Sequence, residues 1–155
     1  MYSEFITGGF SAPVSALLTG HRFRDPGFKF GESPAAQEQQ RDDVDELLSR
    51  LMKEKKIVLL NIRSDRTYNS ADFVRPPMMP DAHAYGLLGY RSDTRTVRCF
   101  NPWGNDFKPK GPPGMKYGYP TRRGQFDMPL QEFMMVFRSL SYETDEPLGA
   151  KTLGE

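Results

Sequence analysis

The first third of the chain has two helix-like stretches of apolar residues separated by a segment without a regular pattern. FSAPVSALLTG predicts one short helix that ends at the glycine stop Gly20. The next segment, HRFRDPGFKFGESP, is rich in glycine, proline and aromatic residues and predicts a loop. Ser33 before Pro34 then has the residue types of a helix N-cap and first turn. Apolar residues recur behind it at three-to-four spacing, which predicts an amphipathic helix over about residues 35 to 55.

Strand-like patterns dominate the rest of the chain. The apolar run IVLLNIRS predicts a strand buried on both faces, and the prolines of DRTYNSADFVRPPMMPD predict irregular structure after it. HAYGLLGY and TRTVRCFN predict the two strands of a hairpin, because the short polar turn RSD joins them. A glycine- and proline-rich loop follows at 105–124, then a short strand at GQFDM, a helix over about residues 129 to 137 and a last strand at RSLSYE.

Together these elements predict the α+β fold class, with a mainly antiparallel β-sheet and two or three helices. The chain has 155 residues, of which 37 % are hydrophobic and 26 % charged, as in ordinary globular proteins with one buried core. We therefore expect one domain over residues 1–144. Residues 145–155 lack an apolar pattern and predict a flexible C-terminal tail.

Charge and cysteine content narrow the class of protein. The 21 basic residues exceed the 20 acidic ones by one, and no long basic block occurs, so we expect neither nucleic acid nor a membrane as a partner. A single cysteine excludes an internal disulfide framework and a cysteine-based zinc site. The segment MYSEFITGGF does not have the basic start and apolar run of a signal peptide. We expect a reducing, cytoplasmic location.

The hairpin carries the candidate chemistry. Histidine is the side chain most easily tuned to exchange a proton near neutral pH, and His83 opens the first strand. Asn101 ends the second strand, where its amide oxygen can accept a hydrogen bond from the imidazole and fix the orientation of the ring. The indole of Trp103 can shield that contact from water. On spacing alone, both a catalytic base and a purely structural histidine remain open.

The segments HAYGLLGY, FNPWG and GQFDMPLQEF, in this order, resemble the second half of the calpain-type cysteine protease core, within the papain-like group. TGGFSAPVSALLTG is similar to the double-glycine segment that opens this half, so the resemblance spans about residues 5 to 142. It implies that His83 is the base of a catalytic triad, that Asn101 orients it, and that Trp103 covers their contact. An extended polypeptide is the implied substrate.

The resemblance also implies substrate contacts made by the backbone. Gly8 and Gly9 would pair with the substrate in the manner of an added strand. Ala82, where the family usually has glycine, would bind substrate through its carbonyl group. Met78 and Met79, in the irregular segment before the histidine, are placed beside the cleft by position alone.

Two family features are not matched. The nucleophilic cysteine lies in a preceding half of the family's core, and Cys99 is expected to be a buried strand residue instead, so this chain should not cleave peptides by itself. The family also binds calcium through acidic residues where this chain has Arg123 and Gln125, so we expect no metal or other cofactor. Asp106 and Asp127 are nearby but are expected to be solvated loop carboxylates.

Two functions follow. The first is the His/Asn half of a calpain-like cysteine endopeptidase, whose partner is the half that carries the cysteine. The alternative is a non-catalytic, calpain-like module that binds peptides or proteins. If the domain stands alone, it should expose the apolar face that normally meets the cysteine half, so we expect self-association.

Overall fold

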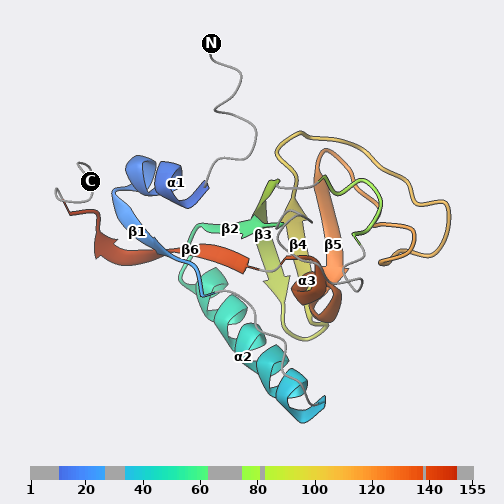
Figure 1. Cartoon of the computed structure of the whole chain (residues 1–155), viewed down its shortest axis with the longest axis horizontal. Coiled ribbons are helices and arrows are strands. Elements are labelled where there is room, and N and C mark those ends of the chain that lie inside the picture. The colour runs from blue at the N-terminus through green and yellow to red at the C-terminus, as the bar shows by residue number, and fades with distance from the viewer. Residues whose placement is uncertain (1–10, 27–33, 63–74, 81–82, 138, 150–155) are drawn as a thin grey trace, which may run out of the picture.

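The computed structural model describes residues 11–26, 34–62, 75–80, 83–137 and 139–149 (Figure 1). Three helices and six strands follow one another in these ranges: α1 (Ser11–Thr19), β1 (His21–Arg24), α2 (Pro34–Lys53), β2 (Val58–Asn61), β3 (Ala84–Arg91), β4 (Thr96–Phe100), β5 (Gln125–Pro129), α3 (Leu130–Val136) and β6 (Ser139–Pro147). The predicted N-cap Ser33 lies outside the described residues.

The six strands form one sheet in the order β1-β6-β2-β3-β4-β5, and every neighbouring pair is antiparallel. This confirms the predicted α+β class with a mainly antiparallel sheet. The predicted hairpin is also confirmed, since β3 pairs with β4 from Gly86 opposite Phe100 to Arg91 opposite Thr96. The strand after it in sequence, β5, continues on the other side of β4, so these three strands form a local meander.

The core lies between the sheet and the helices α2 and α3 (Figure 1). Helix α2 contributes residues at three-to-four spacing, the strands contribute alternate positions, and α3 contributes buried residues along its whole length. The largest of the fully buried side chains are Phe133, Phe137, Leu48, Leu51, Leu60, Met128, Leu130 and Met134. The predicted amphipathic helix is therefore confirmed, and its apolar face holds α2 against the sheet.

The turn of the β3–β4 hairpin is fastened to α2 by polar contacts. The Arg95 guanidinium lies 2.6 Å from Asp42 and 3.2 Å from Asp45. The Tyr90 hydroxyl donates a 2.8 Å hydrogen bond to the Asp45 carboxylate. Desolvation and this bond raise the pKa of Tyr90 above its ordinary range, so the hydroxyl stays a donor. These bonds fix how the hairpin is placed on the helix.

One segment predicted as loop is a strand. HRFR forms β1, which pairs with β6 from His21 opposite Pro147 to Arg24 opposite Tyr142. Its side chains alternate between half-buried and exposed, as expected for the outermost strand of a sheet. A strand of this length has too few apolar residues to be recognised among the glycines and prolines that follow it.

The predicted tail at 145–155 is wrong for its first residues, because β6 continues to Pro147. Pairing with β1 satisfies the backbone there, and Leu148 donates a further 2.7 Å hydrogen bond to the Gly20 carbonyl oxygen. Asp145 forms an ion pair with Lys56, and Glu146 lies 2.8 Å from Arg24. Charged side chains thus occupy the exposed end of a paired strand.

The burial of β2 also differs from the prediction. Val58 and Leu60 are buried, whereas Leu59 and Asn61 on the other face are only half-buried. The strand lies between β3 and β6 inside the sheet, which satisfies its backbone. The predicted burial is therefore right for one face of the strand, which packs on the core, and wrong for the other face, which is partly exposed.

Candidate functional site

The candidate site lies at the end of the β3–β4 hairpin that is opposite its turn. His83 directly precedes β3, and Asn101 directly follows β4. The β3–β4 ladder ends where Gly86 pairs with Phe100, so the residues just before β3 and just after β4 meet at this end of the sheet. The hairpin itself therefore gathers the histidine, the asparagine and the tryptophan at one end of the sheet.

His83 and Asn101 are hydrogen-bonded. The ring atom Nε2 lies 2.9 Å from the amide oxygen Oδ1 of Asn101. The same oxygen accepts the backbone N–H of Trp103 at 3.1 Å, and the amide nitrogen Nδ2 donates to Oδ1 of Asn105 at 2.9 Å. Asn101 is only 2 % exposed, so all its side-chain bonds are made inside the protein.

These bonds determine which imidazole nitrogen carries the proton. A backbone N–H is always a donor, so the Asn101 atom that faces Trp103 N–H must be the oxygen. An oxygen that faces His83 Nε2 must in turn receive a proton from it. Neutral His83 is therefore protonated on Nε2, and the lone pair is on Nδ1, where a base would act.

Two aromatic rings flank the imidazole. The Trp103 ring lies 4.3 Å from the His83 ring between centroids, tilted by 47°, and the Tyr85 ring meets it edge-on at 4.9 Å. Tyr85 is buried among Phe126 and Phe137, whereas Trp103 is 68 % exposed. The imidazole thus contacts the buried ring of Tyr85 on one side and the largely exposed indole of Trp103 on another.

The turn after Asn101 is clamped to the start of β5. Asn101 N–H donates to the Gly124 carbonyl oxygen at 2.7 Å, and Gly124 N–H donates to the Asn105 carbonyl oxygen at 2.7 Å. Gly124 has a φ of +79°, and a Cβ added there would lie 2.2 Å from the Asn101 carbonyl oxygen. Only glycine meets both conditions, so Gly124 is required for the close approach that holds the Asn101 backbone.

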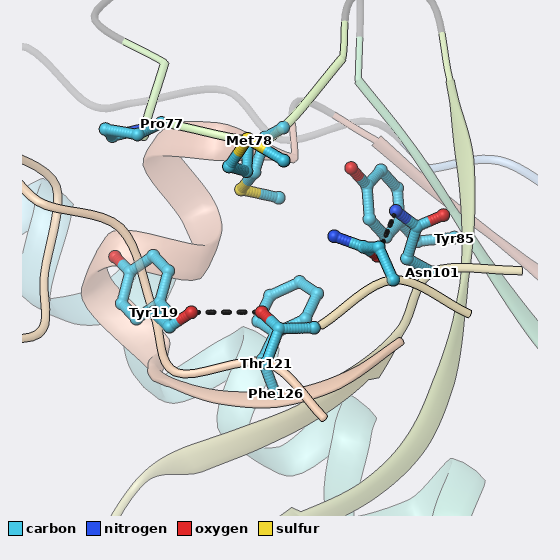
Figure 2. A pocket seen from close by; sticks show the side chains of 9 residues that line it. Pro77, Met78, Tyr85, Asn101, Tyr119, Thr121 and Phe126 are labelled. Atoms are coloured by element: carbon cyan, nitrogen blue, oxygen red, sulfur yellow. Dashed lines mark hydrogen bonds between the residues drawn. The ribbon is translucent and has the colours of Figure 1, made fainter. Parts of the chain in front are cut away.

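A shallow pocket adjoins the asparagine (Figure 2). Its apolar wall includes Met78, Tyr119 and Phe126, and its polar groups come from Asn101, Asn105, Tyr85 and Thr121. Figure 2 shows Pro77 and Met78 across the pocket from Phe126, with Tyr85 and Asn101 together at one side. The Tyr85 hydroxyl is buried without a hydrogen-bond partner among the described residues, and burial raises its pKa.

The two methionines placed beside the cleft by position differ from each other. Met78 is 56 % exposed and lies at the rim of this pocket. Met79 is only 8 % exposed and packs against the core, but it also lines this pocket, so a contact of either methionine with substrate stays a prediction. A turn over these residues sends the first side chain outward and the second inward.

Cys99 is the buried strand residue that the sequence predicts. Its side chain is fully buried in the core, on β4, and burial raises the pKa of the thiol well above its usual value. An activated thiolate needs partial exposure and a positive environment. Cys99 has neither, and it supplies no nucleophile to the histidine.

Arg123 and Gln125, which the resemblance aligns with calcium-binding acidic residues, take part in other contacts. Arg123 is exposed, and its backbone N–H donates to the Asp106 carboxylate at 2.5 Å, while Gln125 begins β5. Asp127 was predicted to be a loop carboxylate but lies in β5, with Arg98 at 2.8 and 3.0 Å. Within the described ranges, no group of three or more His, Cys, Asp or Glu side chains is arranged to hold a metal ion.

Three predicted substrate contacts lie outside the described residues: Gly8, Gly9 and Ala82. Conversely, Asn105, Tyr85 and Gly124 neighbour the histidine–asparagine pair but were not predicted from the sequence. A second asparagine four residues after Asn101, and a glycine just before the next strand, were the available signals. Neither signal is specific without the register of the sheet.

A scan of the chain against models of known protein families found no match, and a search of curated proteins found none either. In the part of the chain that the structure describes, no helix has the length and apolar character needed to cross a membrane.

Proposed function

We propose that this chain is the His/Asn half of a calpain-like cysteine endopeptidase, an enzyme that hydrolyses peptide bonds. The observation that carries the proposal is the 2.9 Å bond from His83 Nε2 to Asn101 Oδ1, in a network that leaves the lone pair on Nδ1. A base held by an orienting group is two thirds of a nucleophilic triad.

In the complete site, the thiol would come from a segment outside this sequence, because Cys99 is its only cysteine and is buried. His83 Nδ1 would accept the proton of that thiol, and the thiolate would attack the scissile carbonyl carbon. The imidazolium would then return the proton to the leaving amine as the C–N bond breaks. In the second step His83 would take a proton from water as its oxygen attacks the thioester carbon. The C–S bond then breaks, the acid product leaves, and the imidazolium returns its proton to the thiolate.

Several features support the rest of the proposal. The exposed Trp103 and Met78 beside the site offer apolar surface to an extended polypeptide or to the cysteine-bearing half. Arg123 and Gln125 in place of acidic residues favour a reaction that does not depend on calcium in this half. We also propose a reducing, cytoplasmic location, since a catalytic thiolate must stay reduced.

The experiment joins this chain to the segment that supplies the thiol. The reading frame should encode, ahead of this chain, a cysteine in a G-x-C-W-like context. In the joined protein, iodoacetamide should alkylate that cysteine at pH ~6, where an ordinary thiol is almost unreactive. Replacing His83 by alanine should slow alkylation by about 100-fold. His21→Ala is the matched control, because the chain has only these two histidines.

The same experiment separates the alternative function. If no such cysteine is encoded, or if its alkylation rate does not depend on His83, the protease proposal is wrong. A peptide-binding module would then be the better description, and titration with extended peptides should show binding that Trp103→Ala weakens.

Self-association is tested independently by gel filtration. Because apolar side chains are exposed around the site, the separate domain should form dimers or larger species at high concentration. A clean monomer that binds no apolar dye would contradict this part of the proposal.

A further inference from the structure

We propose that Asn105 is a positioning residue, which holds the Asn101 amide and through it the protonation pattern of His83. This inference rests on the proposed function for its catalytic meaning, but its test does not. The chain of bonds runs from Asn105 Oδ1 to Asn101 Nδ2, and from Asn101 Oδ1 to His83 Nε2, with both distances at 2.9 Å.

The Asn101 amide needs a partner at each end to keep one orientation. Trp103 N–H holds the oxygen end, and Asn105 Oδ1 holds the nitrogen end. Since Asn101 is 2 % exposed, loss of Asn105 would leave a buried N–H₂ donor without that partner. The amide would then rotate toward whatever acceptor it can find, and Oδ1 would leave the line of His83 Nε2.

Asn105 is well placed to resist such a rotation. Its backbone carbonyl accepts Gly124 N–H at 2.7 Å, and Gly124 in turn accepts Asn101 N–H at 2.7 Å. Both asparagines are therefore tied to one glycine, at a fixed separation. The side chain of Asn105 is half-buried and lines the pocket beside Asn101, so packing restricts its rotamers.

A merely structural asparagine would stabilise the turn without affecting the imidazole. The distinguishing quantity is the solvent exchange rate of the His83 Nε2 proton, which its hydrogen bond to Asn101 slows. With two histidines in the sequence, ¹⁵N-histidine labelling and His21→Ala identify this proton by NMR. The measurement uses this chain alone, without a cysteine half or substrate.

Asn105→Ala should raise the exchange rate about tenfold, the equilibrium factor for losing one ordinary hydrogen bond. Asn105→Asp keeps an oxygen acceptor for Asn101 Nδ2 and should retain the slow rate of the parent. Unchanged exchange in folded Asn105→Ala would overturn the inference, as would fast exchange in Asn105→Asp.

If Asn105→Ala does not fold, Asn105→Ser takes its place. The serine hydroxyl lies closer to the backbone than Oδ1 of asparagine, so it cannot reach Asn101 Nδ2 and the acceptor is still lost. If neither folds while Asn105→Asp does, Asn105 only stabilises the turn and the inference is wrong.

The outcome of the exchange experiment is also distinct from that of the alkylation test. A His83-dependent alkylation rate with an Asn105-independent exchange rate refutes the positioning role alone, and the reverse result refutes the protease alone.

Discussion

Replacing Gly124 by alanine tests the close backbone contact between Gly124 and Asn101. The added Cβ would lie 2.2 Å from the Asn101 carbonyl oxygen, whereas nonbonded carbon and oxygen approach only to about 3.3 Å. The two backbones would have to separate by about 1 Å. The 2.7 Å hydrogen bonds that Gly124 forms with Asn101 and Asn105 would then exceed the length of a real bond.

The expected cost has two parts. A left-handed backbone conformation costs alanine about 1–2 kcal/mol, since Gly124 has a φ of +79°. The two lost hydrogen bonds add about 1 kcal/mol each. We expect Gly124→Ala to lower the free energy of unfolding by about 3–4 kcal/mol, measured by urea denaturation with two-state analysis.

Gly104 provides the matched control. It also has a left-handed backbone, with a φ of +70°, but an added Cβ there meets nothing within 4 Å. Gly104→Ala should therefore cost only the conformational part, about 1–2 kcal/mol. The difference between the two variants measures the clash. Equal losses of stability in both variants would refute the reasoning that Gly124 clamps the Asn101 backbone.

Three further variants or conditions test the core, the thiol and a surface charge pair. Phe133→Ala should destabilise the fold by about 3–5 kcal/mol in urea, while Leu88→Ala on the exposed side should change stability by less than about 0.5 kcal/mol, because only the first side chain is fully buried. Cys99 should not react with a disulfide reagent in the native protein at pH 8 but should react once urea unfolds it, because burial raises its pKa; rapid native labelling would contradict this. The pKa of Asp127 is lowered, mainly by the hydrogen bond from Arg98, so their contribution to stability should be present above the unfolded pKa, about 4, and be lost as the pH falls through the lower folded value. Asp127→Asn should abolish that part of the pH dependence below about pH 4, and an unchanged stability profile would count against the pair.

Local patterns predicted most of the elements because each is encoded over a short stretch. The apolar spacing of α2 and the polar turn of the hairpin each depend on neighbouring residues, and both were placed within a few positions. The strand β1 was missed because its pairing with β6 joins residues more than a hundred positions apart. No local pattern records such a partner, and HRFR on its own resembles the loop that follows it.

The site divides in the same way. The proximity of His83 and Asn101 could be predicted from the sequence, because the two residues flank the strands of a hairpin and an antiparallel hairpin brings those strand ends together. The contacts of Asn105 and Gly124 with Asn101 could not be predicted, because they depend on the pairing of β5 with β4. That pairing brings the end of the loop between the two strands back to Asn101. A polar residue in a glycine-rich loop has many ordinary roles, and only its partner identifies this one.

The order of strands also bears on how the protein folds. The pairing of β3, β4 and β5 involves consecutive strands, whereas pairing β1 with β6 closes a loop of more than a hundred residues. Closing longer loops costs more chain entropy, and distant contacts slow folding. We expect the meander that carries the histidine and asparagine to form early, and the outer edge of the sheet to join last. Residues 83–129 would then acquire their native arrangement while the β1 edge is still open.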